Sequence, residues 1–255
     1  MTRFIACVSA KGGVGKTTTA INLGIALHNF KQSVIVVDAN TTTPGVGIAL
    51  GAPTVDIGLN DIVKKGSIED AVHYHDSGLK VIPSRLDLKE RSAKTKTQLG
   101  SVINKLGGMA DIALFDSSAG VTEEARVLME SVDELLVITT PDPLSVIASL
   151  KTVKIAEEMG KDITGIVVTR RKSSTAMSTK SIENTMGYPV IGEIPEDGSV
   201  LGASLRQNAV STLFPNAPAS VAYRNLAAFM IDEPYYEPIP RDGMLKRVMK
   251  AVRNE

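Results

Sequence analysis

A glycine-rich segment near the start of the chain has the composition and spacing of a phosphate-binding loop. It lies between a predicted strand and a predicted amphipathic helix and runs Ser9-Ala10-Lys11-Gly12-Gly13-Val14-Gly15-Lys16-Thr17-Thr18. Its glycines let successive backbone N–H groups converge on phosphate oxygens, and the helix that begins at Lys16 adds the positive end of its dipole. We expect Lys16 to bridge the β- and γ-phosphates of a nucleotide and the Thr17 hydroxyl to ligate Mg²⁺. Ala10 replaces the glycine of the generic pattern, but the strand–loop–helix context disfavours the alternative of an ordinary glycine-rich turn.

Two aspartates, Asp38 and Asp116, each close a predicted buried strand. The carboxyl ends of parallel strands meet at the edge of an open α/β sheet where ligands bind. Both carboxylates are therefore candidate partners of Mg²⁺, either directly or through water. The alternative is that each aspartate caps the helix that follows it. Small residues and Gly120 follow Asp116 and favour the metal-linked role there, whereas both alternatives stay open for Asp38.

The phosphate loop contains a second lysine, Lys11, which is not needed for the chain's own phosphates because Lys16 and the loop amides already serve them. With Lys11, the loop resembles the signature Lys-Gly-Gly-x-Gly-Lys-Thr of the MinD/ParA family of ATPases with a deviant Walker A motif. The resemblance covers nearly the whole chain and includes the segments Asp38-Ala39-Asn40 with Pro44, Asp116-Ser117-Ser118-Ala119-Gly120, Thr139-Thr140-Pro141 and Ile194-Pro195-Glu196-Asp197. It implies that Lys11 reaches the phosphates of a second copy in a homodimer that encloses two Mg-ATP. The residues it implies for holding ATP are Gly12, Gly13, Val14, Gly15, Lys16, Thr17 and Thr18.

The base is expected to be adenine. A guanine-binding protein of this class is expected to carry Asn-Lys-x-Asp after a late strand, and this chain has Thr169-Arg170-Arg171-Lys172 there. The resemblance implies that adenine lies between this segment and the loop that follows the last predicted strand. Carried onto this sequence, the contacts are Thr169, Arg170, Pro195, Glu196 and Asp197. Thr169 replaces the asparagine that is often found at its position.

Asn40 departs from the family pattern. Members usually have Asp-x-Asp, and the second carboxylate helps to position and activate the water that attacks the γ-phosphate. An amide keeps the size and one hydrogen-bond acceptor, but it cannot take a proton. We therefore expect slow ATP hydrolysis together with intact nucleotide binding and dimerisation. The expected catalytic residues are Lys11, Lys16, Asp38, Asn40 and Asp116, and the expected Mg²⁺ partners are Thr17, Asp38 and Asp116.

The rest of the chain alternates apolar runs with helix-like stretches. The predicted strands are Phe4 to Val8, Val34 to Val37, Leu79 to Ile82, Ile112 to Phe115, Leu135 to Ile138, Ile163 to Val168 and Val190 to Ile194. The predicted helices are Lys16 to Phe30, Lys94 to Leu106, Glu123 to Ser131, Leu144 to Met159, Ser178 to Met186 and Ser220 to Met230. Continuous apolar runs suit strands that are covered on both faces. The alternation predicts an α/β fold with a single doubly wound, mostly parallel sheet of the P-loop NTPase type, and we expect one ATPase domain over residues 1–231.

The last residues of the chain differ in composition. A Pro-rich linker is expected over residues 232–242, followed by a C-terminal amphipathic helix over residues 243–255. Between Met244 and Arg253, five apolar residues share one side of that helix and four basic residues the other. A basic amphipathic segment at a chain end favours reversible attachment to an anionic membrane surface, although a helix docked on the domain is the alternative. MinD-like proteins carry a similar terminal helix and typical ParA relatives do not, so the resemblance is closest to the MinD-like branch.

These features predict a MinD-like ATPase that dimerises around Mg-ATP and positions division or other cellular machinery through a protein regulator or cargo. With a single cysteine, Cys7, and no apolar run of membrane-spanning length, we expect a cytoplasmic protein that is peripheral at the inner face of the cell membrane. The first alternative is a ParA-like partition ATPase that binds nucleic acid through Lys80 to Lys96 and Arg170 to Lys172. The second is an ATP-gated scaffold that does not hydrolyse ATP.

Overall fold

The computed structural model describes residues 1–64, 67–85, 93–172 and 177–240. Eight strands in this part of the chain form one sheet, in the order β3-β4-β2-β5-β1-β6-β7-β8. Their bounds are β1 Arg3–Val8, β2 Val34–Asp38, β3 His73–Tyr74, β4 Lys80–Ile82, β5 Ile112–Asp116, β6 Glu134–Thr139, β7 Asp162–Arg171 and β8 Val190–Pro195. Every neighbouring pair is parallel except β3 and β4, which are antiparallel. The predicted doubly wound, mostly parallel sheet is confirmed.

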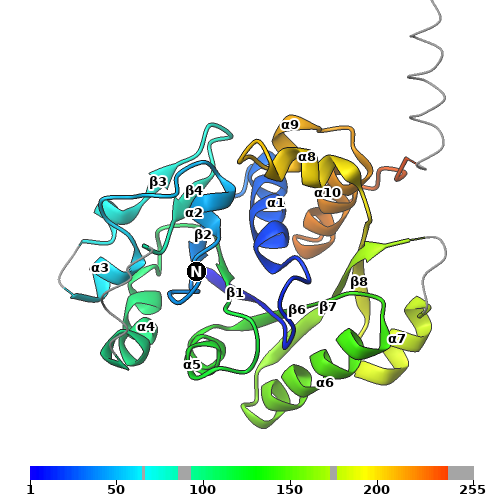
Figure 1. Ribbon diagram of the computed structural model, residues 1–255, viewed down its shortest axis with the longest axis horizontal. Helices are drawn as coiled ribbons and strands as arrows, with labels where there is room; N and C mark the ends of the chain where they lie inside the picture. Colours follow the sequence, from blue (N-terminus) through cyan, green and yellow to red (C-terminus); the bar gives the residue numbers. More distant parts are fainter. Residues whose placement is uncertain (65–66, 86–92, 173–176, 241–255) are drawn as a thin grey trace, which may run out of the picture.

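Helices cover both faces of the sheet (Figure 1). One face carries α1 Lys16–Asn29, α2 Val46–Ala49, α8 Gly198–Ser204, α9 Val210–Leu213 and α10 Pro218–Met230. The other carries α3 Leu59–Lys64, α4 Ala93–Lys105, α5 Glu123–Ser131, α6 Pro143–Glu158 and α7 Thr179–Met186, and a short 3₁₀ helix spans Glu69–Ala71. The six long helices expected from the sequence are present. The short elements β3, α2, α3, α8 and α9 were not predicted.

The central strands show why the sequence forms this sheet. Along β1, Ile5 and Cys7 pack into the core beneath α1 and α10, whereas Ala6 and Val8 pack into the core on the opposite face. Because both faces are covered, the buried runs of the central strands β1, β2, β5 and β6 are almost entirely apolar rather than alternating. Cys7 is fully buried, as expected of a small core residue.

Parallel pairing brings the carboxyl ends of the central strands to one edge. Asp38 at the end of β2 is paired in register with Asp116 at the end of β5. The phosphate loop follows β1, the strand that lies between β5 and β6. The end of β7, which extends to Arg171 beyond the predicted end at Val168, and the segment after β8 complete this edge. Sequence stretches separated by up to about 180 residues therefore meet where ligands bind in folds of this type.

The end of the chain is described only as far as residue 240. Residues 232–240, most of the predicted linker, form no helix or strand and lie beside α10 (Figure 1). The predicted amphipathic helix over residues 243–255 lies outside the described residues. Within the described part, no helix combines the length and apolar composition that a membrane span requires.

Candidate functional site

The phosphate loop joins β1 to α1 and has a backbone that only glycine adopts easily. Gly13 and Gly15 have φ angles of 74° and 95°, in the left-handed region. The first α-helical hydrogen bond, from Thr19 N to Gly15 O, is 2.8 Å long, so α1 begins directly at Lys16. The Lys16 side chain is buried. Burial lowers the pKa of its ammonium, and the charge of Asp116 offsets part of that shift.

Asp116 and Thr17 form the centre of the site. The Thr17 hydroxyl donates to Asp116 Oδ2 at 2.6 Å. Asp116 Oδ1 is buried without a hydrogen-bond partner among the described residues. Burial raises the pKa of Asp116 to about 6, although the Thr17 hydroxyl and the Lys16 charge act in the opposite direction. An unsatisfied buried carboxylate oxygen beside a threonine hydroxyl and a phosphate-binding loop is what Mg²⁺ coordination requires.

Asp38 is used differently from Asp116. Its Oδ1 accepts from Asn40 N at 3.1 Å, and its Oδ2 accepts from Gly45 N and Val46 N, each at 2.9 Å. Burial and the neighbouring Asp116 charge raise the pKa of Asp38 well above its ordinary value, while these backbone bonds act in the opposite direction. Asp38 therefore holds the loop between β2 and α2 in place. Asp38 and Asp116 place two carboxylates close together, and a divalent cation beside them would neutralise their negative charge.

No group of three or more His, Cys, Asp or Glu side chains in the described ranges could by itself hold a metal ion. A cation at Asp116 would therefore need oxygens from phosphate and water. That is the usual coordination of Mg²⁺ in nucleotide sites, where one or two carboxylates and substrate phosphates share the ion. The residues present fit Mg²⁺ bound together with a nucleotide.

Asn40 is bonded within its own loop. Its Nδ2 donates to Thr43 O at 2.6 Å, and its Oδ1 accepts from Thr43 N at 3.0 Å. The next residue, Thr41, donates through both its backbone N–H and its hydroxyl to Glu124 Oε1. Glu124 lies in the first turn of α5 and is 2% exposed. The loop over residues 40–46 is thus held both by Asp38 and by a buried carboxylate from the next layer.

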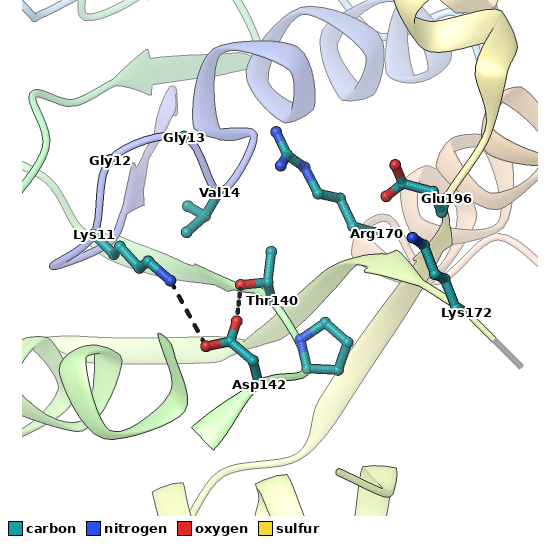
Figure 2. Close-up of a pocket in the computed structure, with 10 residues that line it drawn as sticks. Lys11, Gly12, Gly13, Val14, Thr140, Asp142, Arg170, Lys172 and Glu196 are labelled. Carbon is teal, nitrogen blue, oxygen red and sulfur yellow. Dashed lines mark hydrogen bonds and ion pairs between the residues drawn. The ribbon is translucent and has the colours of Figure 1, made fainter. Parts of the chain in front are cut away.

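Lys11 reaches away from its own loop to the start of α6. Figure 2 shows its side chain extending toward Asp142. Lys11 Nζ donates to Ser145 Oγ at 2.8 Å and lies 3.6 Å from Asp142 Oδ1. Asp142 also accepts from the Thr140 hydroxyl at 2.6 Å and from Ser145 N at 3.0 Å, which caps α6. Burial alone would raise the pKa of Asp142, but these hydrogen bonds outweigh it and hold that pKa at about 2.

Two adjoining cavities open beside the loop. One, of about 600 Å³, is lined by Lys11, Gly12, Gly13, Val14, Thr140, Pro141, Asp142, Arg170, Lys172 and Glu196 (Figure 2). The other, of about 360 Å³, is lined by Val14, Gly15, Thr18, Thr169, Arg170, Ile194, Pro195, Glu196, Asp197, Val200, Leu201, Ser204 and Tyr223. The two cavities share Val14, Arg170 and Glu196. The end of β7 and the segment after β8, which were expected to enclose a base, therefore line cavities that adjoin the phosphate loop.

Within that space, the side chains expected to contact the base differ in what they bond. Thr169 is 4% exposed, and its hydroxyl donates to Val14 O at 2.6 Å, so it fastens the phosphate loop. Asp197 accepts from Ser199 N at 2.8 Å and from Ala219 N at 3.0 Å, so it joins α8 to α10. Arg170 has a left-handed φ of 52°, which is uncommon for a residue with a side chain, and it lines both cavities.

Residues 5–210 match the model of the CobQ/CobB/MinD/ParA nucleotide binding domain. The chain belongs to this family. It is 33% identical over 252 residues to an uncharacterized ATP-binding protein of Methanocaldococcus jannaschii, a match that covers 97% of this chain and 96% of the relative. The cell division ATPase MinD of Pyrococcus furiosus has a similar structure, with a TM-score of 0.85, 28% identity, and 91% and 99% of the two chains covered. The septum site-determining protein MinD of Pyrococcus horikoshii, complexed with Mg-ADP, gives a TM-score of 0.84 and 27% identity, with 90% and 96% covered.

The chain is a MinD-like ATPase, as the sequence predicted, and the residues of its site fit the expected cofactors ATP and Mg²⁺. Sequence reasoning missed several residues around the site of this ATPase. Glu124 belongs to no recognisable motif, and the only sequence signal for it is its position in the first turn of the predicted helix α5. Ser145 and Asp142 follow the quoted segment Thr139-Thr140-Pro141, where Asp-Pro signals a helix start, but nothing in the spacing links them to Lys11.

Proposed function

We propose that this MinD-like ATPase is an ATP-dependent switch that forms a homodimer around two Mg-ATP. The observation that carries the proposal is the direction of Lys11. Its side chain is 46% exposed and extends from the rim of the phosphate loop to α6, whereas Lys16 occupies the buried position inside the loop. Among the described residues, the Lys11 ammonium contacts the start of α6 through the buried Ser145 hydroxyl and the partly exposed Asp142 carboxylate, and it is placed to exchange these contacts for the phosphates of another copy.

Within one chain, each residue of the loop has a proposed role. The backbone amides of residues 12–18 and the Lys16 ammonium hold the β- and γ-phosphates. The Thr17 hydroxyl and Asp116 hold Mg²⁺, which neutralises phosphate charge when bound. Asp38 adds a second carboxylate next to Asp116, and it fixes the loop over residues 40–46 through its bonds to backbone amides. The hydrogen bonds that already order these groups support this assignment.

The adenine base is proposed to lie in the cavity between Arg170 and the loop after β8. Pro195, Glu196, Leu201 and Tyr223 also line this cavity. A guanidinium beside an aromatic base gains cation–π attraction, and Arg170 lines both cavities. Thr169 and Asp197 act as supports, because their polar atoms already bond the phosphate loop and α10.

Hydrolysis is proposed to be slow. The attacking water needs a group that accepts its proton, and the Asn40 amide cannot do so. The amide is also bonded to Thr43 on the same loop. Slow turnover lengthens the life of the ATP-bound dimer. A single-turnover assay distinguishes a slow switch from an ATP-gated scaffold, which would leave bound ATP intact.

The dimer is proposed to attach to an anionic membrane through residues 243–255, whose structure lies outside the described part. Four basic residues contribute about 1 kcal/mol each near an anionic leaflet, and burial of five apolar side chains adds roughly 1.5–3 kcal/mol each. Ordering roughly ten residues costs about 1–2 kcal/mol per residue, so one tail binds marginally. Two tails on one dimer add about 10²–10⁴ in avidity. The protein would then reside in the cytoplasm and at the inner face of the cell membrane, and would position division or other machinery through a regulator or cargo that recognises the dimer.

The nucleic-acid alternative has less support. Arg170 and Lys172 line the cavity beside the phosphate loop. Lys80 Nζ donates to Met109 O at 3.3 Å and to Ser33 Oγ at 3.4 Å, and residues 86–92 lie outside the described part.

A sedimentation experiment with anionic vesicles, using ATP, ADP and a chain that ends at Arg241, tests the membrane proposal. Vesicle binding that occurs with ATP but not with ADP, and that is lost when the chain is truncated, supports the proposal. Equal binding with ATP and ADP, or full binding by the truncated chain, overturns the membrane switch.

A further inference from the structure

The chain reverses direction after α10. Asp232 has a left-handed φ of 53°, a conformation that aspartate tolerates better than most residues. Glu233 N donates back to Ala228 O at 2.9 Å, and Arg3 Nη1 donates to Met230 O at 2.8 Å at the end of the helix. Residues 233–240, here called the strap, consequently run back along α10 toward its first turns. The sequence led us to expect an extended spacer here, and the segment is extended but it is fastened to the domain.

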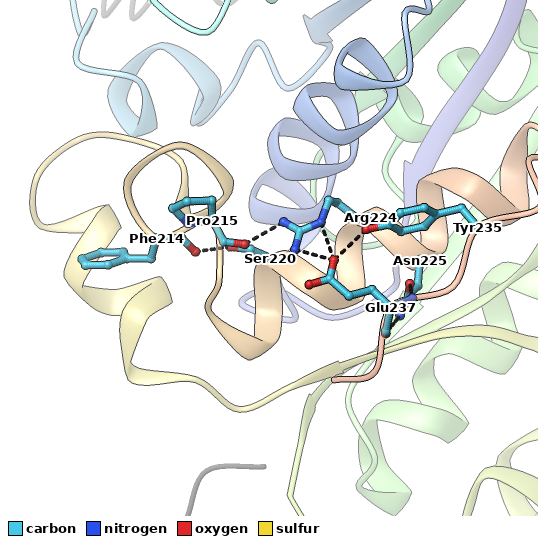
Figure 3. Close-up of polar contacts among 7 residues, drawn as sticks. All are labelled: Phe214, Pro215, Ser220, Arg224, Asn225, Tyr235 and Glu237. Atoms are coloured by element: carbon cyan, nitrogen blue, oxygen red, sulfur yellow. Dashed lines mark hydrogen bonds and ion pairs between the residues drawn. The ribbon is translucent and has the colours of Figure 1, made fainter. Parts of the chain in front are cut away.

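Glu237 is the main point of attachment (Figure 3). Its backbone N–H donates to Asn225 Oδ1 at 2.8 Å, and its carbonyl accepts from Asn225 Nδ2 at 2.7 Å. Its carboxylate accepts from Arg224 Nε at 2.9 Å, from Arg224 Nη2 at 2.6 Å and from the Tyr235 hydroxyl at 2.6 Å. One residue of the strap therefore has its donor, its acceptor and its charge all satisfied by α10 and by the strap itself.

The surroundings strengthen this attachment. The side chains of Arg224 and Glu237 are 21% and 34% exposed, so the ion pair is partly removed from water. Burial alone would raise the pKa of Glu237, and the hydrogen bonds from Tyr235 and Arg224 outweigh it and lower that pKa. The Tyr235 ring packs edge-on against Phe30 at the end of α1, with ring centroids 5.1 Å apart. Arg224 Nη1 also donates to Pro215 O at 2.6 Å, which ties the loop before α10 into the same cluster.

The helix that carries the strap also forms a wall of the nucleotide site. Tyr223, which precedes Arg224, is 1% exposed, lines the base cavity and lies 3.3 Å, oxygen to oxygen, from Thr19 in α1. Ala219 N at the start of α10 donates to Asp197 in the loop after β8. The same two turns of α10 thus contact the nucleotide cavity on one side and the strap on the other.

We propose that the strap is a mount that fixes the point from which residues 241–255 leave the domain, on the part of α10 that also lines the nucleotide cavity. This inference rests on the proposed function only in assigning membrane binding to those residues. A fixed mount removes residues 232–237 from the free linker and roughly halves its length. Effective concentration between two linked sites falls as about the −3/2 power of linker length, so the mount raises the avidity of two tails about threefold over a free linker.

Hydrogen exchange of the full-length protein tests whether the strap is fastened. The release variant carries Glu237→Ala and Asn225→Ala, and Glu233→Ala in the same segment is the matched control. We expect the amides of Tyr235 and Glu237, which are hydrogen-bonded in the strap, to exchange at least about tenfold more slowly than in an unfolded chain in the wild type and the control, and within about threefold of the unfolded rate in the release variant. Unprotected amides in the wild type would overturn the mount. Unchanged nucleotide binding by the release variant shows that the domain is still folded.

Sedimentation with anionic vesicles and ATP then tests the purpose of the mount. We expect the release variant to bind roughly threefold more weakly than the wild type, with the control unchanged. If the strap is released and vesicle binding stays the same, the mount is wrong while membrane attachment stands. If the wild type binds vesicles in no nucleotide state, the membrane function fails and the role given to the strap fails with it, even where exchange shows the strap fastened.

Discussion

The Lys11 ammonium at the rim of the phosphate loop lies 2.8 Å from the Ser145 hydroxyl at the start of α6. This contact, together with Asp142 at 3.6 Å, keeps the signature lysine on its own chain. Both charged side chains are more than two-fifths exposed, and ion pairs of that kind contribute only about 0–1 kcal/mol. A second copy with bound ATP can therefore compete for Lys11 at small cost.

Asp142→Asn tests that competition. The amide oxygen can still cap α6 by accepting from Ser145 N, so the substitution removes the charge while keeping the cap. We expect ATP-dependent dimers of the variant to be up to about fivefold tighter in analytical ultracentrifugation. Weaker dimers would indicate that Asp142 instead supports Lys11 in the dimer. Glu158→Gln, at the far end of α6, is the control for the loss of one negative charge.

Asp116→Asn tests the metal site. Because burial raises the pKa of Asp116 to about 6 in the folded chain, above its ordinary 3.8, the protonated form is favoured by folding. This contribution to stability is present below about pH 4 and is lost as the pH rises through about 6. We expect the metal-free variant to unfold at a higher temperature than the wild type at pH 7.5, with the difference vanishing near pH 4. Mg-ADP should stabilise the wild type and fail to stabilise the variant, and a variant that gains as much from Mg-ADP would exclude Asp116 from the metal site.

Asn40→Asp tests the missing carboxylate. The substitution removes the Nδ2 donor to Thr43 O, while one oxygen of the new carboxylate can still accept from Thr43 N, so the second oxygen is expected to turn away from the Thr43 carbonyl. A positioned base contributes about 10²–10⁴ to rate, and we expect ATP hydrolysis to rise by at least about tenfold in a phosphate-release assay. Thr42→Asp in the same loop controls for added charge. A flat rate with dimers still forming would mean that the missing carboxylate is not the limitation.

Glu124→Gln tests the link between α5 and the loop over residues 40–46. Glu124 accepts from both the backbone N–H and the hydroxyl of Thr41, and charge-assisted bonds of this kind are about twice as strong as neutral ones. We expect faster amide exchange at residues 40–46 and a several-fold fall in affinity for Mg-ATP. The neighbouring Glu123→Gln, on the exposed side of the same turn, should change neither. Unaltered exchange at Thr41 in the Glu124 variant would contradict the link.

The sequence was sufficient for the sheet and for the residues of the phosphate loop. Runs such as the one around Leu114 are apolar throughout because helices cover both faces, and this pattern is visible without coordinates. The positions of Gly13 and Gly15 could also be predicted from the sequence, because a left-handed backbone favours glycine. Short elements such as β3 and α9 escaped prediction because two to four residues carry too little periodicity.

The division of labour inside the site could not be read from the sequence. Asp38 and Asp116 occupy equivalent strand ends, yet Asp38 is bonded to three backbone amides, whereas one oxygen of Asp116 has no hydrogen-bond partner within the described ranges. The family resemblance implies that Thr169 contacts the base, but the Thr169 hydroxyl donates to Val14 O. These assignments depend on distances between segments that are far apart in the chain. The attachment of Glu237 to α10 is hidden for the same reason, because prolines on either side predict only an extended segment.

The most direct measurement is the mass of the protein by sedimentation velocity with Mg-ATP, for the wild type, Lys11→Ala and Lys16→Ala, with nucleotide binding measured on the same samples. We expect a dimer for the wild type, and a monomer that still binds nucleotide for Lys11→Ala, because Lys11 leaves its own loop for α6. For Lys16→Ala we expect a monomer that binds nucleotide poorly, because it loses a charge-assisted bond to phosphate. Loss of nucleotide binding by monomeric Lys11→Ala, or ATP-dependent dimers that form without Lys11, would contradict the central claim.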